Sequence, residues 1–168
     1  MAFKKTSETI AISFGLTELG PNTFTQEEIA LQLDILNNEI FVVLAIDQDL
    51  QSPDAIAATN TQISSSVTTT SQTALALLSN TNCLSSAQKS IRAAGFVDGG
   101  VGFDRRADST YTGDVPYIGL IATNNFFVQL QGAANLAPKA VTGRVWGYRA
   151  KADSSTYAAL VQSEVLSA

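Results

Sequence analysis

Apolar and polar residues alternate along several short stretches of the chain, which is the pattern of half-buried β-strands. In the first fifty residues these stretches read ETIAISFGL, EEIALQLDIL and EIFVVLAIDQDL. Gly20-Pro21 marks a turn after the first stretch, and Asn37-Asn38 is predicted to form a hairpin turn between the second and the third. The third stretch is apolar on both sides, so we expect both of its faces to be covered.

The middle of the chain has a different composition. From Ala55 to Gln88 it contains no charged residue and is rich in Ser, Thr and Asn. Because Thr and Val favour the extended conformation, TQISSSVTTTSQTALALL predicts one or two strands. Two alternatives stay open, namely a flexible Ser/Thr linker and an uncharged surface pressed against a neighbouring subunit.

Two segments have the spacing of short helices, residues 84–94 and 154–166. In the first, apolar positions recur at three- and four-residue intervals ahead of Gly95, which is a typical helix stop. In the second, Asp153 or Ser154 can cap the first turn, and apolar side chains share one face.

Beyond Gly95 the chain is rich in turn residues, and strands are predicted again at YIGLIA, FFVQLQG and GRVWGYRAKAD. Seven to nine short strands with two short helices predict an all-β fold, a two-sheet antiparallel sandwich of the jelly-roll type. No internal repeat or linker divides the sequence. We therefore expect a single β-sandwich domain over 1–168, with a short N-terminal arm at 1–7 and a C-terminal helix.

The composition of the chain excludes several classes of function. Charged residues form 15% of the chain, against about 25% in typical soluble domains, and the net charge is −5. That balance disfavours general nucleic-acid binding, which needs clustered Lys and Arg. The chain has no His and one Cys, Cys83, so Ser-His and Cys-His nucleophile pairs, His-ligated zinc and an internal disulfide are excluded. We expect Cys83 to be a small buried residue, and the chain to have no enzymatic activity, cofactor or small-molecule substrate.

Two groups of carboxylates are candidates for other chemistry. They are Asp47, Asp49 and Asp54 at a strand end, and Asp104, Asp108 and Asp114 in a loop. Oxygen-rich loops can hold Ca²⁺, but neither spacing matches an EF-hand, so we predict solvated turn residues with cation binding as the alternative. A glycosidase-like carboxylate pair is a further alternative, because separation in space cannot be read from a sequence.

The basic and aromatic residues are the candidates for contacts with partners. Arg, Tyr and Trp are enriched in protein interfaces, so we predict that a set of six contacts a neighbouring subunit. The set consists of Arg105, Arg106, Arg144, Trp146, Tyr148 and Arg149.

Alternation within GRVWGYRAKAD places Arg144, Trp146 and Tyr148 on one side of a strand. It places Val145, Arg149 and Lys151 on the other side. Three alternatives stay open for this strand: a purely structural role with a basic edge, a thin nucleic-acid patch, and a carbohydrate- or surface-binding module that uses Trp146 and Tyr148 as a stacking platform.

Near the C-terminus, YIGLIATNNFFVQLQGAANLAPKAVTGRVWGYRAKADSSTYAALV combines paired strands, an Asn-rich turn, an open Gly/Ala/Asn loop, an aromatic-basic strand and a small helix. Over roughly residues 8–152 the chain resembles the single jelly-roll capsid proteins of tailless icosahedral double-stranded DNA viruses, including those of halophilic archaea. The resemblance rests on size, strand pattern and composition, and it carries over no functional residue.

The resemblance implies a capsid subunit located in the virion. Such a subunit would assemble with copies of itself or with other capsid proteins, and it would have no catalytic role. Low charge and exposed apolar area agree with a shell protein that buries much of its outside. A net-negative subunit would not pack DNA directly, which fits a shell separated from the genome by an internal membrane.

Overall fold

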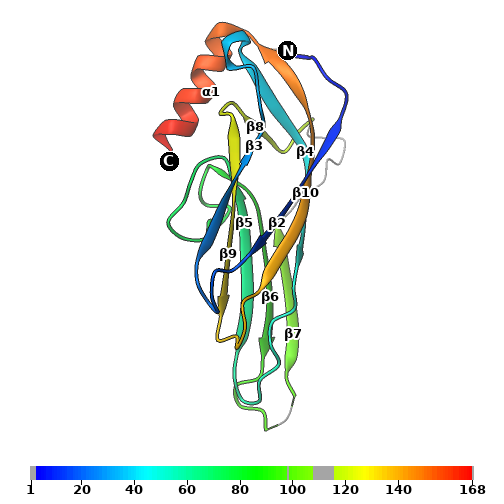
Figure 1. Cartoon of the computed structure of the whole chain (residues 1–168), viewed down its shortest axis with the longest axis vertical. Helices are drawn as coiled ribbons and strands as arrows, with labels where there is room; N and C mark the ends of the chain where they lie inside the picture. Colours follow the sequence, from blue (N-terminus) through cyan, green and yellow to red (C-terminus); the bar gives the residue numbers. More distant parts are fainter. Residues whose placement is uncertain (1–2, 98, 108–115, 168) are drawn as a thin grey trace.

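The computed structural model describes residues 3–97, 99–107 and 116–167. Two antiparallel sheets pack face to face into an elongated sandwich, with one helix across one end (Figure 1). Sheet A contains β1 (Phe3–Lys5), β2 (Ile10–Thr17), β10 (Ala140–Ala152), β4 (Glu39–Leu50) and β8 (Gly119–Ile121). Sheet B contains β3 (Thr25–Ala30), β9 (Asn125–Ala133), β5 (Thr61–Thr68), β6 (Cys83–Arg92) and β7 (Val101–Ala107).

The strands pair in a nested order, which is the topology of a jelly roll. β2 pairs with β10, β3 with β9, β4 with β8, and β5 with β6. β7 extends sheet B beyond β6, and β1 lies on the same side of β10 as β2. The predicted two-sheet sandwich of jelly-roll type is therefore confirmed, and residues 3–5 of the expected N-terminal arm form β1.

The predicted helix at 84–94 is wrong, because this segment is strand β6. The spacing of Ala87 and Ile91 is even, so it fits a strand as well as a helix. β6 lies between β5 and β7 and pairs with both, and this two-sided pairing decides its conformation. β6 ends at Arg92, so Gly95, with a φ of 91°, lies in the loop after a strand and is not the predicted helix stop.

The predicted hairpin turn at Asn37-Asn38 is also wrong. β3 ends at Ala30 in sheet B, and β4 begins at Glu39 in sheet A. The residues between them cross from one sheet to the other and contain a short 3₁₀ turn, η1 (Ile35–Asn37). Local alternation cannot distinguish a hairpin from such a crossing, because both leave the strands themselves unchanged.

The uncharged middle segment forms strand β5, a long connection, and the first part of β6. This connection folds back over sheet B, where the Ala76 N–H donates to the Ser66 hydroxyl over 3.2 Å. Ser66, Thr68 and Gln129 on the outer face of the sheet are thereby fully buried. The Gln129 amide donates to Thr68 and accepts from Ser66. The chain's own loop therefore covers the uncharged outer face of β5 at Ser66 and Thr68, whereas Gln62 and Ser64 on this face stay partly exposed.

A second apolar cluster lies on the outer face of sheet A, beneath α1 (Ser154–Leu166), whose predicted span is confirmed. The Asp153 carboxylate caps the helix by accepting from the Thr156 N–H over 2.7 Å. Tyr157, Leu160 and Val161 pack against the cluster. Within the described ranges, no helix is long and apolar enough to cross a membrane.

Glu164 fixes the far end of α1 to the connection between β8 and β9. Its carboxylate is buried and accepts from the backbone N–H groups of Ala122, over 2.7 Å, and Thr123, over 3.2 Å. Burial raises the pKa of the Glu164 carboxyl above the ordinary glutamate value, and the two N–H donors offset this only in part. Burial, and then the charge of Glu164, also raise the pKa of Tyr157.

We expect the docking of α1 to weaken as the pH rises through the raised pKa of Glu164. Because the folded chain holds this proton more tightly than the unfolded chain, the contribution is full below the ordinary glutamate pKa and is lost above the raised one. Denaturant unfolding at a series of pH values measures it. Glu164→Gln should remove this part of the pH dependence, whereas Glu27→Gln on exposed β3 should retain it. Parallel curves for Glu164→Gln and the parent would contradict the assignment.

Candidate interaction surface

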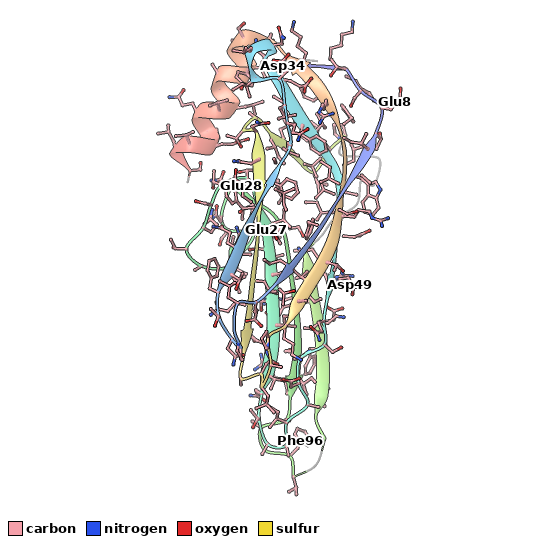
Figure 2. All side chains as sticks on the ribbon, viewed as in Figure 1. Glu8, Glu27, Glu28, Asp34, Asp49 and Phe96 are labelled. Carbon is pink, nitrogen blue, oxygen red and sulfur yellow. The ribbon has the colours of Figure 1, made fainter. Side chains whose placement is uncertain are left out.

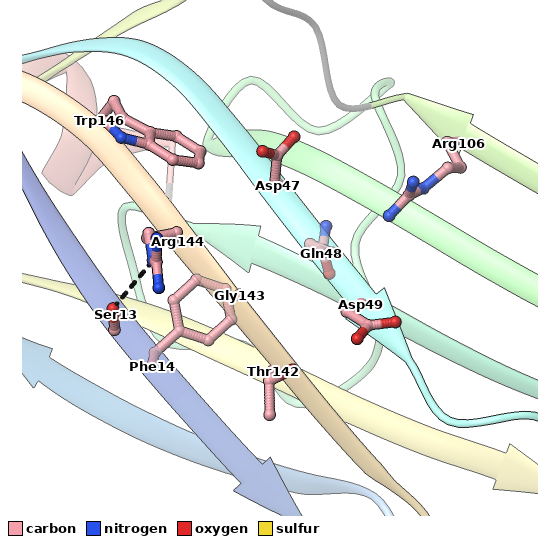
Figure 3. Close-up of a pocket in the computed structure, with 10 residues that line it drawn as sticks. All are labelled: Ser13, Phe14, Asp47, Gln48, Asp49, Arg106, Thr142, Gly143, Arg144 and Trp146. Atoms are coloured by element: carbon pink, nitrogen blue, oxygen red, sulfur yellow. Dashed lines mark hydrogen bonds between the residues drawn. The ribbon is translucent and has the colours of Figure 1, made fainter.

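Trp146 and Arg144 lie on the outer face of β10, beyond the part of sheet A that α1 covers (Figure 3). In the sheet register, Trp146 lies between Ala11 of β2 and Ala45 of β4. These small neighbours leave the indole ring partly exposed. Arg144 lies between Ser13 and Asp47 in the same register, and its Nε donates to the Ser13 hydroxyl over 3.2 Å.

These side chains line an open hollow of about 630 Å³. β8 pairs only with Phe41–Val43, so the part of β4 that bears Asp47 and Asp49 extends beyond the end of β8. Arg106 reaches the hollow from β7, on the other side of β4 (Figure 3). The hollow is lined by Ser13, Phe14, Asp47, Gln48, Asp49, Arg106, Thr142, Gly143, Arg144 and Trp146.

Two glycines on the inner face of β10 let this strand pack closely on the core. A Cβ at Gly143 would lie 2.4 Å from the Phe14 ring, and one at Gly147 would lie 2.2 Å from the Val42 carbonyl oxygen. Gly147 also adjoins a shift in the register between β10 and β4. Over Gly143–Gly147 the inner positions of β10 hold only glycine and valine, and Arg144 and Trp146 face outward.

The structure divides the six predicted contact residues among several places. Arg106, Arg144 and Trp146 share the hollow. Tyr148 lies on the same side of β10 as Trp146 but packs against the cluster beneath α1, with the Lys5 ammonium 5.0 Å from its ring centre.

The two remaining arginines lie elsewhere. Arg149 donates from its guanidinium to the Leu31 carbonyl over 2.9 Å, and its Nε lies 3.6 Å from a Glu39 carboxylate oxygen. Arg105 and Arg106 lie in strand β7 rather than in a loop, so consecutive side chains point to opposite faces. Arg105 therefore lies on the outer face of sheet B, where it donates to Gln88.

The predicted carboxylate groups do not assemble as groups in the described part of the chain. Asp47 and Asp49 line the hollow, whereas Asp54 pairs with Lys139. Asp104 is an exposed residue of β7, and Asp108 and Asp114 lie outside the described residues. Within the described ranges, no three acidic or thiol side chains are arranged to hold a metal ion. In the hollow itself, two carboxylates accompany two guanidinium groups, so its formal charge is balanced.

The predicted burial of Cys83 holds only in part. The thiol is half-buried at the start of β6 and lies 3.4 Å from the Ser85 carbonyl oxygen. Burial raises the pKa of this thiol, which keeps it in the less reactive protonated form.

The loops at the end of the sandwich opposite α1 are organised by a buried carboxylate, Glu18. It is 4% exposed and accepts three backbone N–H groups, from Thr23 over 3.0 Å, Gly132 over 3.0 Å and Lys139 over 2.9 Å. One side chain thus connects the β2–β3 loop with the β9–β10 loop. A Cβ at Gly132 would lie 2.6 Å from the Asn135 amide nitrogen, so this close approach requires glycine.

Side-chain amides and a salt bridge join the remaining loops to this unit. Asn135 exchanges hydrogen bonds with Asn22 and accepts the Asp54 N–H over 3.0 Å. The Asp54 carboxylate accepts from the Lys139 ammonium over 2.6 Å, and this bond is the main reason why the pKa of Asp54 is lowered. The Asn60 amide oxygen accepts the backbone N–H groups of Ala93 and Ala94, both over 3.0 Å. All four loops at this end are thereby linked.

This hydrogen-bonded end nevertheless exposes large apolar side chains. Leu19 is 86% exposed and Leu136 is 78% exposed, on the two loops that Glu18 joins. Phe96 and Val97 are exposed at the tip of the β6–β7 hairpin, which is the lowest point of the molecule in Figure 2. We call these four residues the loop-end surface. The loops of Leu19 and Leu136 are held by the buried hydrogen bonds of Glu18, and the start of the β6–β7 loop is held by the two bonds to Asn60.

The sequence did not reveal Glu18, Asn135 or Glu164, the residues that fix the loops and the helix. Each follows or lies within a turn-like or amphipathic segment where a polar residue is typical of a solvated surface. Their roles depend on N–H groups that are far away along the chain. Glu18 and Lys139, for example, are 121 positions apart. The local signal was therefore weak, apart from the Asn-rich composition of the loops.

No protein-family model matches the chain, and no curated protein matches it. Among solved structures, a similar chain comes from a structure of Desmodium yellow mottle tymovirus. The two share 13% sequence identity with a TM-score of 0.34, and the match covers 88% of this chain and 91% of the other. This similarity concerns the fold alone, which the strand order already defines, and we draw no function from it. This match does not confirm the narrower resemblance to tailless double-stranded DNA viruses.

We expect Glu18→Gln to loosen the loop end, because an amide offers one acceptor oxygen where the carboxylate offers two. The three N–H groups could not all be satisfied, and each lost bond to a buried charged group costs about 1.5–3 kcal/mol. Denaturant unfolding measures the loss in free energy, and hydrogen exchange at Thr23, Gly132 and Lys139 should accelerate. Glu8→Gln removes an exposed carboxylate and should change neither quantity. Unchanged exchange at these three amides in Glu18→Gln would contradict the role of Glu18.

Proposed function

We propose that this chain is a structural capsid subunit, which assembles with copies of itself or with other capsid proteins into an icosahedral shell of a virion. The loop-end surface carries the proposal. Isolated exposed leucines are normal on a protein surface, but a monomeric protein gains no stability from ordering three loops that present apolar side chains to water. A subunit that buries this end against a neighbour gains affinity, because the loops are already ordered before association.

The hollow on sheet A supports the same reading. Trp and Arg are enriched in the parts of interfaces that contribute most to binding, and Trp146, Arg144 and Arg106 meet there. Carboxylates and guanidinium groups in one hollow allow complementary charge pairing with a second subunit. We propose this hollow as a second contact, distinct from the loop-end surface.

The jelly roll is compatible with this role but does not decide it, since the fold serves capsid proteins, lectins and cupins. The finer features of the proposal are a shell of the type found in tailless double-stranded DNA viruses, an internal membrane, no direct contact with the genome and no catalysis. The net charge of −5 supports the separation from nucleic acid.

We expect the chain to form large particles at high concentration, and the double variant Leu19→Asp, Leu136→Asp to remain monomeric. Two carboxylates would have to be desolvated at the contact, while the exposed positions leave the fold unaffected. Sedimentation velocity and electron microscopy measure assembly, and circular dichroism checks the fold. Leu36→Asp adds one such carboxylate at a leucine that is 91% exposed at the opposite end, and it should assemble as the parent does. A parent chain that stays monomeric in both physiological and molar salt would overturn the proposal.

Trp146 provides an independent measurement, because it is the only tryptophan of the chain. If the hollow closes against a neighbour, the indole ring loses water, and its fluorescence should shift to shorter wavelength as particles form. The Leu19→Asp, Leu136→Asp variant should retain the emission of the free subunit at every concentration. Particles that form without any change in emission would show that the hollow is not a contact.

A further inference from the structure

The outer face of sheet B carries a second hollow, of about 450 Å³, near the edge formed by β6 and β7. We call its five lining residues the β6–β7 face: Gln88, Ser90, Arg92, Phe103 and Arg105. In the register, Phe103 lies opposite Ser90, and Arg105 lies opposite Gln88. The short Ser90 side chain is buried, whereas the Phe103 ring is 57% exposed. The exposed, apolar Phe103 ring thus lies beside the buried, polar Ser90 side chain.

Among the described residues, those that line this face include two arginines and no acidic side chain, unlike those of the hollow on sheet A. Arg92 and Arg105 are exposed and flank Phe103, about 13 Å apart along the strands at roughly 3.3 Å per residue. Asp104 lies next to both Phe103 and Arg105 in sequence, but alternation along β7 directs it to the opposite face of the sheet. The β6–β7 face therefore complements an anion.

Amide and hydroxyl groups extend this face toward β5. The Arg105 guanidinium donates to the Gln88 amide oxygen over 2.9 Å, and the Gln88 amide nitrogen donates to Gln62 over 3.0 Å. This chain of bonds orients the guanidinium, most of whose N–H donors remain for a ligand. A neighbouring hollow of about 250 Å³ shares Gln88 and Arg105 and adds Gln62 and Ser64. Amides and hydroxyls both donate and accept, as a polyhydroxylated ligand requires.

We propose that the β6–β7 face binds a carboxylated saccharide. Phe103 packs against the C–H face of a pyranose ring, which is apolar although the rim of the ring is hydroxylated. Arg92 and Arg105 pair with carboxylates, for which the planar guanidinium fork is well suited. Gln62, Gln88 and the neighbouring serines exchange hydrogen bonds with the ring hydroxyls.

A nucleic acid fits this face less well, although Phe103 resembles a stacking platform for a base. Binding to a phosphate backbone draws on a continuous row of cations, and this face offers two arginines on a chain with a net charge of −5. An acidic peptide would satisfy the arginines but would leave the amide and hydroxyl groups without matching partners. The combination of one aromatic ring, two guanidinium groups and a row of amides favours a saccharide.

The test uses titration calorimetry of the full chain with four probes: a galacturonic acid trimer, its methyl ester, sialyllactose and lactose. At least one of the two carboxylated probes should bind, and its neutral counterpart should bind at least tenfold more weakly. Failure of both carboxylated probes to bind, or equal binding of the neutral counterparts, would overturn the proposal. Tighter binding of oligothymidylate or of a polyglutamate peptide would do so as well, since it would identify a different class of ligand.

Variants locate the site. Arg92→Gln, Arg105→Gln and Phe103→Ala should each weaken the carboxylated probe at least tenfold, while circular dichroism remains unchanged. Phe103→Leu retains an apolar side chain without the ring and should also lose affinity. Lys151→Gln, which removes an exposed cation from β10, should bind as the parent does. If the arginine and phenylalanine variants keep the affinity of the parent, the site is elsewhere and the assignment is wrong.

This proposal does not depend on assembly. The same titrations on the monomeric Leu19→Asp, Leu136→Asp variant separate saccharide binding from assembly, because its changes lie on loops away from the β6–β7 face. Saccharide binding by that variant is expected whether or not the parent forms particles. Its loss in that variant alone would contradict a site contained within one subunit.

Discussion

Two phenylalanine rings pack directly on the backbone of β10, at Gly143 and Gly147, and the rest of the molecule depends on this close approach. It allows β10 to pair on both sides, with β2 and with β4, and to close sheet A over the core. A side chain at either glycine would meet a ring or a carbonyl oxygen, and overpacking of this kind typically costs about 1–3 kcal/mol. Between the two glycines, the large Trp146 side chain lies on the outer face of the strand.

In this jelly roll, the residues that stabilise the fold and the residues that are exposed for contacts lie in different places. Nested pairing brings alternate loops to one end, where Glu18 and Asn135 join segments that are remote in sequence. At the other end, Glu164 holds α1 on the second apolar cluster. Each end is therefore fixed by a buried polar group that satisfies backbone N–H donors, and the surfaces between the ends are left to exposed side chains. Such anchoring is expensive to break, because a buried N–H without a partner is not solvated.

Much of the fold was predictable because alternation is a local signal. It located β2, β4 and β10, and the capping residue Asp153 located α1. The prediction of a helix at 84–94 was wrong because serine-rich β6 has little intrinsic preference for helix or strand. Its pairing on both sides is not visible in the sequence. The candidate site was predicted only in part. Alternation correctly put Arg144 and Trp146 on one side, but no local rule brings Arg106 to them from another sheet.

Strand β7 supplies consecutive arginines to two different surfaces, since Arg105 belongs to the β6–β7 face and Arg106 to the hollow on sheet A. The side-chain period of a strand is two, so a slip of one residue against β6 would exchange the faces of both. Phe103 would turn inward and Asp104 outward at the same time. The length of the β6–β7 loop is therefore under a double constraint: a single insertion or deletion that moved the register would remove both surfaces at once, whereas a change of two residues would keep their faces.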